Sequence, residues 1–263
     1  MSSGGGYLFD NLSKIGPWLK SSPHVRFFLN RALWETGYPW THLYPTPIEA
    51  IFPGIDRMTE PVQIVYPFER LRGTSMELEE VVAVASIARF CKSAKVVEVG
   101  TFDGNTTLNL AMNLAPGGRV VTLDLPPQGD PNAQNAAPGT GYEGGKPAPF
   151  QRRQYVGHPA ADRIEQVYGD SARLDWGGLG GPFDLAFLDG DHSSRYVRSD
   201  TRQALSVLRP GGIVLWHDYE WRSVAAPIDR AVQRGERIHW IRGTRLAVGV
   251  FPEPQKSVAS FQD

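Results

Sequence analysis

Residues 96–107 read VVEVGTFDGNTT, a short apolar strand that ends in a glycine turn and leads into a helix. Gly100 permits a tight turn, and Gly100 and Gly104 together leave the backbone open to a ligand. Strands alternate with helices around this turn, which predicts right-handed βαβ units and a parallel sheet covered on both faces. The expected fold class is therefore α/β, doubly wound.

The other expected elements follow one another at short intervals. One helix is expected to begin near Gly73, with Thr74 or Ser75 as its cap, and to reach Phe90. Further helices are expected at 106–114, 194–208 and 224–234, and strands at 96–100, 119–123, 163–168, 183–188 and 212–216. Residues 238–241 and 246–251 are expected to form an antiparallel hairpin, which completes a mostly parallel seven-stranded sheet.

Composition divides the chain into three parts. Residues 1–72 are rich in aromatics and proline, so we expect a mainly helical or irregular N-terminal extension that serves as a substrate lid or an oligomer contact. Residues 73–255 are the expected main domain, and residues 256–263 the expected tail. Within the main domain, residues 126–149 are rich in glycine and proline, which predicts either a mobile lid or a tolerated surface insertion.

The overall composition is that of a globular protein with a small-molecule partner. The chain has 263 residues and a formal net charge of -1, so no global field attracts nucleic acid or a membrane surface. Cys91 is the only cysteine, which excludes an internal disulfide and suits a reducing compartment. No apolar run approaches the ~20 residues of a membrane span, and residues 1–6 do not resemble a secretory signal. We expect a cytoplasmic protein, and the aromatic extension favours a homo-oligomer.

Acidic residues surround the glycine turn. Glu98 precedes Gly100 by two positions, and Asp124 ends the next strand, where a carboxylate suits the paired hydroxyls of a ribose. The spacing G-x-x-x-G differs from the G-x-G-x-x-G of dinucleotide sites, and Glu98 and Asp103 would repel a pyrophosphate. This disfavours NAD-dependent oxidoreduction. S-adenosylmethionine fits better, because it carries a sulfonium and an ammonium and has no phosphate.

Five motifs, followed by the terminal hairpin, resemble in their order those of class I S-adenosylmethionine-dependent methyltransferases: VVEVGTFDGNTT, VVTLDLP, YGDS, FDLAFLDGDH and LRPGGIVLWHDY. The resemblance covers residues 73–252 and implies a Rossmann-like fold. It implies that Glu98 and Gly100 lie near the methionine part of the cofactor and that Asp124 holds the ribose. It also implies that Asp170 and Ser171 flank the adenine, although either residue could instead only cap the turn before Ala172. Further cofactor contacts are expected at Ser75, Met76, Phe102, Asp103, Thr106 and Asp189.

Two acids follow different strands of the expected sheet. Asp189 follows 183–188 and Asp218 follows 212–216. Because adjacent parallel strands lie ~4.8 Å apart, groups at their carboxyl ends can meet at one ion. With His217 they form a candidate divalent metal site, and an imidazole among oxygen ligands would admit Mn²⁺ or Fe²⁺ alongside Mg²⁺. The alternative for His217 is a hydrogen bond to a backbone carbonyl.

This layout resembles the metal-dependent O-methyltransferases of the catechol, caffeoyl-coenzyme A and antibiotic sugar types. In the catechol type an Asn follows the second acid, whereas this chain has Tyr219. In the sugar type an acidic residue precedes the second acid, whereas this chain has His217. The sugar type shares the D-x-x-H spacing of Asp189 and His192.

Methyl transfer to a hydroxyl also needs a base, because a protonated hydroxyl is a poor nucleophile. His192 is the expected catalytic base, with Asp191 as the second choice. The alternative makes Ser193 a helix cap and His192 a surface residue. We expect an O-methyltransferase that acts on a small hydroxylated metabolite such as a sugar or phenol. The alternatives are a metal-independent N- or O-methyltransferase and a partner subunit that binds S-adenosylmethionine without catalysis.

Overall fold

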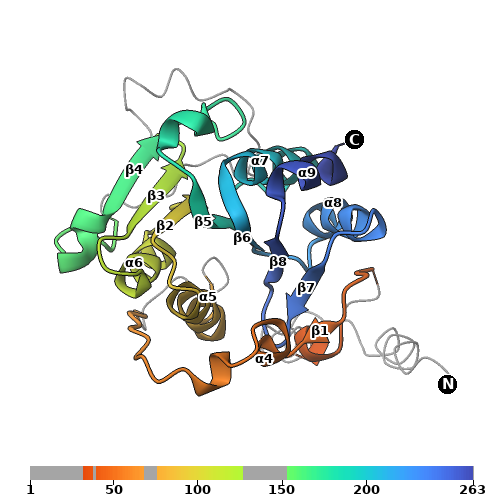
Figure 1. Ribbon diagram of the computed structural model, residues 1–263, viewed down its shortest axis with the longest axis horizontal. Coiled ribbons are helices and arrows are strands. Elements are labelled where there is room, and N and C mark those ends of the chain that lie inside the picture. Colours follow the sequence, from red (N-terminus) through yellow and green to blue (C-terminus); the bar gives the residue numbers. More distant parts are fainter. Residues whose placement is uncertain (1–31, 38–39, 68–75, 127–152, 263) are drawn as a thin grey trace, which may run out of the picture.

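The computed structural model describes residues 32–37, 40–67, 76–126 and 153–262, and its centre is a mixed β-sheet (Figure 1). The strands in these ranges are β1 (Pro45–Thr46), β2 (Lys95–Val99), β3 (Arg119–Asp124), β4 (Ile164–Tyr168), β5 (Phe183–Leu188), β6 (Leu208–Trp216), β7 (Ile238–Ile241) and β8 (Ala247–Phe251). They lie in the order β1-β7-β8-β6-β5-β2-β3-β4. Only β8 runs antiparallel to its neighbours, so the α/β fold with a closing hairpin is confirmed.

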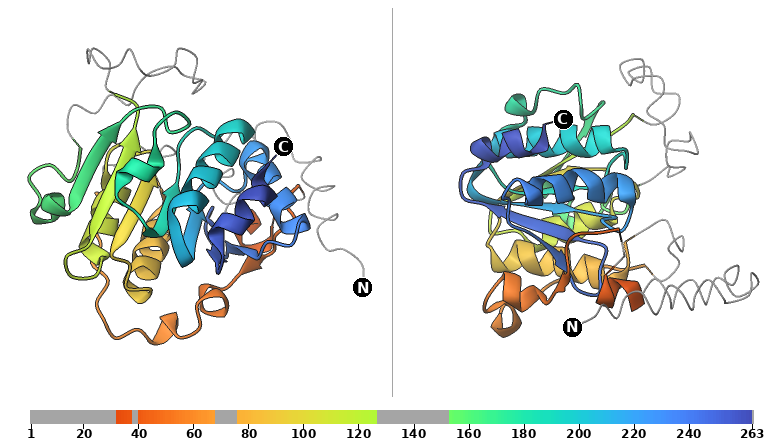
Figure 2. Two further views of the ribbon diagram at one scale, coloured as in Figure 1. Left: turned by 45° about the horizontal axis from the view of Figure 1, so that its top comes forward. Right: turned by 90° about the vertical axis from the view of Figure 1, so that its right-hand side faces the viewer.

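Helices cover both faces of the sheet (Figures 1 and 2). The labelled α-helices are α4 (Ile48–Ile51), α5 (Leu78–Phe90), α6 (Asn105–Asn113), α7 (Ser194–Val207), α8 (Arg222–Gln233) and α9 (Pro254–Ser257), and residues 32–36 are also helical. Short 3-10 turns are η1 (Ile55–Arg57), η3 (Pro159–Arg163), η4 (Trp176–Leu179) and η5 (Val258–Phe261). Helices α5 and α6 pack on one face, and α7, α8 and α9 pack on the other. The sheet is therefore the middle layer of three, as in other doubly wound proteins.

The sheet has one strand more than the seven expected. The extra strand, β1, comes from the predicted extension and pairs in parallel with β7 at the sheet edge. It has two residues and begins with Pro45, so it shows no strand periodicity in the sequence. Trp34 and Leu43 of the same segment are buried in the core. The described residues between 32 and 67 thus contribute side chains to the core of the main domain.

Helix α5 begins at Leu78 and has Glu77 as its N-cap, not Thr74 or Ser75, which lie outside the described residues. Glu77 and Glu80 form a capping box, in which each side chain accepts a hydrogen bond from the backbone of the other residue. The acid-rich first turn therefore contains its own cap.

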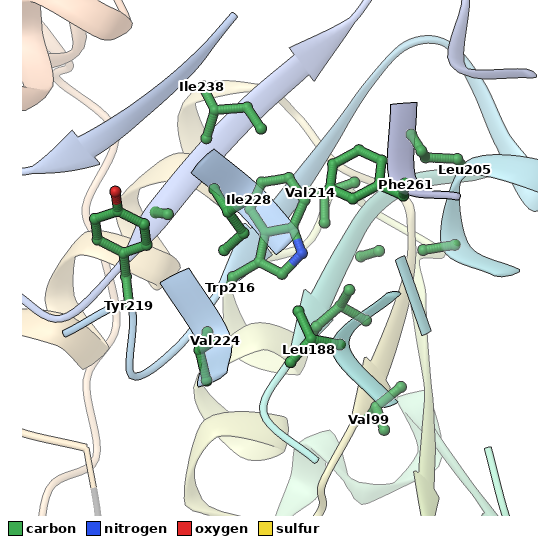
Figure 3. Packing of buried hydrophobic residues seen from close by; sticks show 14 of the residues in the cluster. Val99, Leu188, Leu205, Val214, Trp216, Tyr219, Val224, Ile228, Ile238 and Phe261 are labelled. Carbon is green, nitrogen blue, oxygen red and sulfur yellow. The ribbon is translucent and has the colours of Figure 1, made fainter. Parts of the chain in front are cut away.

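Residues 258–261, which lie in the expected tail 256–263, also pack on the main domain. Phe261 is buried, and its ring stacks on Trp216 with the centroids 6.0 Å apart. Figure 3 shows Trp216 among Val214, Ile228 and Phe261. An aromatic ring removed from water in this way contributes to the same core as α7 and α8.

The parallel strands β2, β3, β5 and β6 have their C-terminal ends side by side on the same side of the sheet. Val99 pairs with both Leu123 and Leu188, and Leu188 pairs with Trp216, so the residues that follow these strands are neighbours. Most of the glycine- and proline-rich segment 126–149, which follows β3, lies outside the described residues. In the part of the chain that the structure describes, no helix is both long enough and apolar enough to span a membrane.

Candidate active site

The glycine turn after β2 has backbone angles that require glycine. Gly100 has a φ of +93°, and a Cβ there would lie 2.1 Å from the carbonyl oxygen of Asp189. Gly104 has a φ of +77° at the N-cap of α6, and a Cβ there would lie 2.8 Å from the ring of Tyr155. Phe102 between them also has a positive φ, of 48°. The turn is therefore a strained, closely packed cradle of backbone.

Glu98 is the buried acid that precedes this turn. The hydroxyls of Thr107 and Thr122 donate to its Oε2, at 2.5 and 2.6 Å, while Oε1 has no hydrogen-bond partner among the described residues. Burial raises the pKa of Glu98 to about 8, and the two hydroxyl donors offset this only in part. An unsatisfied oxygen on a buried carboxyl group is costly. A cationic ligand at Oε1 would satisfy it, so the site fits the ammonium of S-adenosylmethionine.

Two further acids of the predicted cofactor site are held by the chain itself. Arg153 Nη2 lies 2.7 Å from Oδ2 of Asp124, which also accepts a hydrogen bond from the amide of Phe102 at 3.2 Å. Gln154 donates to Asp103 at 2.7 Å. Burial raises the pKa of Asp124, and the nearby Arg153 charge offsets this only in part. Residues 153 and 154 thus contact two acids of the predicted cofactor site, and the contacts of these acids with the cofactor stay a prediction.

The predicted adenine side is built from turn residues. Asp170 accepts hydrogen bonds from the amide of Ala172, at 3.0 Å, and from the hydroxyl of Tyr196, at 3.2 Å. The carbonyl of Ser171 accepts from Trp176 at 2.9 Å. The turn-capping role considered for Asp170 is therefore present. Contact of Asp170 and Ser171 with adenine stays a prediction.

The predicted cofactor contacts just before α5 and on α6 can be placed only in part. The hydroxyl of Thr106 donates to the Met76 sulfur at 3.1 Å, and the hydroxyl of Tyr66 donates to the Met76 carbonyl at 3.3 Å. Met76 is buried. Ser75 lies outside the described residues. Met76 and Thr106 thus come together beside the glycine turn, and their contact with the cofactor stays a prediction.

The acids that follow β5 and β6 meet at the C-terminal ends of these two strands, together with His192. Asp189, His192 and Asp218 each offer a ligand atom, and these atoms all lie within 4.8 Å of one another. His192 Nε2 lies 2.6 Å from Oδ2 of Asp218 and 3.8 Å from Oδ1 of Asp189. Asp218 has a φ of 53°, a left-handed conformation that is rare outside glycine and often found at functional sites. These three residues bring together one nitrogen and two carboxylate groups, a donor set that could hold a cation.

His217, the imidazole predicted as a metal ligand, contacts carboxylates through both ring nitrogens. Its Nδ1 lies 3.0 Å from Oδ1 of Asp189, and its Nε2 lies 3.2 Å from Oε2 of Glu80. Burial acts to lower the pKa of His217, but the charges of Asp189, Asp218 and Glu80 outweigh it and raise the pKa well above its usual range. Among the described residues, the hydrogen-bond partners of the His217 ring are carboxylates and not a backbone carbonyl. The role of His217 as a ligand stays a prediction.

His192 and Asp191 differ in their surroundings. Ser193 is the N-cap of α7 and accepts from the amide of Tyr196, as one reading of the loop predicts, yet His192 is partly buried against Asp218. The His192 ring lies 4.7 Å from the ring of Trp221. Asp191 accepts a hydrogen bond from the Ser193 amide at 2.7 Å. Asp191 thus stabilises the turn, whereas His192 faces the acids.

Two residues of this cluster were not recognised in the sequence. Glu80 of α5 is fully buried, and Arg245, in the turn between β7 and β8, pairs with it at 2.7 Å and with Asp218 at 2.9 Å. Burial alone would raise the pKa of Glu80, but the charges of His217 and Arg245 outweigh it and lower the pKa to about 2. Acids are common in the first turn of a helix, so Glu80 gave no separate signal.

Tyr219, which stands where the catechol type has Asn, turns away from the acids. Its hydroxyl donates to Asp229 and accepts from the amide of Leu43 at 3.2 Å, and its ring makes an edge contact with Trp240 at 5.4 Å. The side chain is fully buried. Its hydroxyl therefore links Leu43, before β1, to Asp229 of α8. It is not directed toward the candidate cation site of Asp189 and Asp218.

Comparison with known proteins agrees with this geometry. A family model described as "Methyltransferase domain" matches residues 97–219. Catechol O-methyltransferase of Mycobacterium tuberculosis is 31% identical over 142 residues, or 50% of this chain and 56% of that protein. Catechol O-methyltransferase domain-containing protein 1 of Mus musculus is 27% identical over 193 residues, or 70% of this chain and 66% of that protein. The chain thus spans less than two thirds of the length of these relatives.

Two solved structures share the fold. The SAH-bound methyltransferase of Podospora anserina has a TM-score of 0.54 and 13% identity, and covers 88% of this chain and 96% of its own. A cofactor-bound protein from MTB has a TM-score of 0.52 and 21% identity, and covers 88% of this chain and 97% of its own. At such identities the likeness concerns the fold alone.

Proposed function

We propose that this chain, which carries a class I S-adenosylmethionine-dependent methyltransferase domain, transfers the methyl group of that cofactor to a hydroxyl of a small metabolite. The observation that carries the proposal is the His192 contact with Asp218 at 2.6 Å, beside Asp189. This cluster follows strands next to the glycine turn, so an acceptor hydroxyl bound at the acids would lie close to a cofactor bound at the turn.

The residues around the turn fit the cofactor, which when bound supplies an electrophilic methyl group on its sulfonium. Glu98 offers a buried oxygen without a partner among the described residues to the ammonium group. Gly100 allows the close approach of the turn to the Asp189 carbonyl, and we propose that the ribose replaces Arg153 as the partner of Asp124. Asp170 and Ser171 are proposed for the adenine side.

A divalent cation also fits, with Asp189, Asp218 and one imidazole as its donors. Such a mixed nitrogen and oxygen set suits Mn²⁺ or Fe²⁺ and tolerates Mg²⁺. When bound, a cation there lowers the pKa of a hydroxyl that contacts it. If an imidazole is a ligand, His192 is the better candidate, because both ring nitrogens of His217 already contact carboxylates, those of Asp189 and Glu80.

His192 can instead act as the base, and its contact with Asp218 favours this role. A hydrogen bond to the carboxylate places a proton on Nε2, which leaves Nδ1 as the basic nitrogen. Asp218 would then orient the ring and stabilise the imidazolium that forms when the hydroxyl gives up its proton. The same ring cannot be ligand and base through one nitrogen, so the two roles are separable by experiment.

A metal-independent reaction is the second candidate, and one observation favours it. Arg245 donates to Asp218 at 2.9 Å, and the His217 ring lies 3.0 Å from Asp189, so each acid already faces a cationic side chain. In the metal-independent reaction, Asp189 and Asp218 orient His192 and need no ion to balance their charge.

The decisive experiment incubates the purified chain with S-adenosylmethionine and a panel of phenols, sugars and amines, and detects methylated products by mass spectrometry. Transfer to a hydroxyl that disappears on exhaustive chelation and returns with Mn²⁺ or Mg²⁺ supports the metal-assisted reaction. Transfer that survives chelation supports the second candidate. If S-adenosylhomocysteine binds in calorimetry but no acceptor is methylated, a non-catalytic binding subunit becomes the better reading.

A further inference from the structure

Glu80 is a carboxylate sealed inside the protein behind the two acids of the candidate site. Its Oε1 accepts from the backbone amide and Nε of Arg245, at 2.8 and 2.9 Å. Its Oε2 accepts from Arg245 Nη2 at 2.7 Å and from the Glu77 amide at 2.8 Å, and lies 3.2 Å from His217 Nε2. Because every one of these contacts must form to offset the loss of hydration, Arg245 and His217 are held in one geometry.

Each of the two groups held by Glu80 reaches one acid of the site. His217 presents its other nitrogen, Nδ1, to Asp189 Oδ1 at 3.0 Å. Arg245 donates its remaining terminal nitrogen, Nη1, to Asp218 Oδ1 at 2.9 Å. Two chains of hydrogen bonds therefore connect the buried Glu80 carboxylate to the acids that follow β5 and β6. We name Glu80, His217 and Arg245 the brace.

The brace determines how the acids face the site. The last torsion of an aspartate is soft, so a carboxylate without a fixed donor turns over a broad range. A donor fixed on Oδ1 of Asp218 sets the plane of the carboxylate and directs Oδ2 toward His192, which it meets at 2.6 Å. Partners that orient reactive groups in this way commonly decide how well those groups function.

The brace is supplied by distant parts of the chain. Glu80 lies 137 positions before His217 and 165 before Arg245. Glu80 and Arg245 both fall outside residues 97–219, the part that matches the methyltransferase domain model. The orientation of the acids thus depends on α5 and on the β7–β8 turn as well as on the strands that carry them.

We propose that Glu80 is a positioning residue of the candidate active site, which acts through His217 and Arg245 to fix the orientation of Asp189 and Asp218. The proposal rests on the proposed function for its catalytic meaning, and its structural part is testable without turnover. Glu80 itself touches neither the acids nor His192 in any contact described above.

The test compares Glu80→Gln with Glu77→Gln as a matched control. Both residues belong to the capping box of α5, and the side-chain contacts with His217 and Arg245 described above are those of Glu80. In ¹⁵N spectra of the labelled imidazoles, Glu80→Gln is expected to shift the ring signals of His192, which Glu80 does not touch, whereas Glu77→Gln leaves them unchanged. Mn²⁺ affinity and kcat are each expected to fall about 10- to 100-fold in Glu80→Gln, with S-adenosylhomocysteine affinity retained.

A second variant tests the proposal in case Glu80→Gln does not fold. Arg245→Lys keeps the buried positive charge but cannot bridge Glu80 and Asp218 as a planar fork does, so it is expected to shift the same His192 signals to a smaller extent. His192 signals that match the wild type in folded Glu80→Gln and Arg245→Lys would overturn the proposal. If the wild type transfers no methyl group, the proposed function fails, while the His192 signals still decide whether Glu80 positions the acids.

Discussion

Nε2 of His192 lies 2.6 Å from Oδ2 of Asp218, although the two residues are 26 positions apart and follow different strands. The contact exists because β5 and β6 are parallel neighbours, with Leu188 paired to Trp216 at their ends. Burial acts to lower the pKa of His192, but the hydrogen bond and charge of Asp218 outweigh it and raise the pKa. The site therefore contains an imidazole that an acid orients and makes more basic.

Replacement of His192 by alanine is expected to lower kcat about 10²- to 10⁴-fold, the range typical of a lost general base. The affinity for S-adenosylhomocysteine should stay unchanged, because the contacts described for His192 are with the acids and Trp221. His239→Gln, an exposed imidazole on β7, is the control. A fall in Mn²⁺ affinity as large as the fall in kcat would make His192 a ligand and refute its role as base.

Asp189→Asn is expected to abolish the stimulation of methyl transfer by a divalent cation and to leave S-adenosylhomocysteine binding largely intact. An amide oxygen is a poorer ligand for a hard cation than a carboxylate, while the backbone contact of Asp189 with the strand before the glycine turn is retained. Asp162→Asn, at an exposed position in η3, serves as control. Equal losses of cation and cofactor affinity would identify Asp189 as a cofactor residue.

Binding of S-adenosylhomocysteine is expected to release a proton at neutral pH. The pKa of Glu98 is raised to about 8, so its carboxyl group is largely protonated at pH 7, and an ammonium at Oε1 would favour the ionised form. Calorimetry in buffers of different ionisation enthalpy measures the release. The dependence on buffer should vanish in Glu98→Gln, and its persistence there would place the proton on another group.

The raised pKa of Glu98 also predicts how the free energy of unfolding depends on pH. The folded pKa of Glu98 lies above the unfolded value of 4.5, so between these values the unfolded state is ionised and the folded state binds one more proton. Stability is therefore lost as pH rises from about 4.5 to about 8, and Glu98→Gln should remove this part of the slope. Urea unfolding across this range compares the two proteins, and parallel slopes would contradict the shift.

Tyr219→Asn, which restores the residue of the catechol type, is expected to destabilise the protein without tightening Mg²⁺ binding. The side chain is fully buried on Trp240, so its loss should cost about 3–5 kcal/mol. Tyr219→Phe, which removes only the hydroxyl between Asp229 and Leu43, should cost about 1–3 kcal/mol. Denaturant unfolding measures both. A stable Tyr219→Asn protein with a tighter Mg²⁺ site would show that this position can supply a ligand.

The order of strands and helices was predictable because it rests on local periodicity. The hairpin strand Ile238–Ile241 and the strand Phe183–Leu188 have the predicted ends, and the buried Glu98 has hydroxyl donors on one of its two carboxyl oxygens. Strand β1 escaped prediction because a two-residue strand that begins with Pro45 has no period to detect. Its place in the sheet is decided by tertiary packing.

The site was predictable where strands deliver its residues and unpredictable where distant segments meet. Asp189 and Asp218 follow strands whose ends must be neighbours. The contacts of Glu80 with Arg245 span 165 positions, and an acid in a first helical turn or an arginine in a hairpin turn is ordinary on its own. Local sequence likewise could not show that His192, next to the cap Ser193, faces Asp218.

The close approach of Gly100 to the Asp189 carbonyl couples two parts of the molecule that could otherwise vary independently. A Cβ at position 100 would lie 2.1 Å from that oxygen, so any side chain there displaces the strand end that carries the acid. Redesign of the turn for another cofactor would therefore disturb the acceptor side as well. In this protein the shape of the glycine turn and the position of Asp189 therefore cannot change independently.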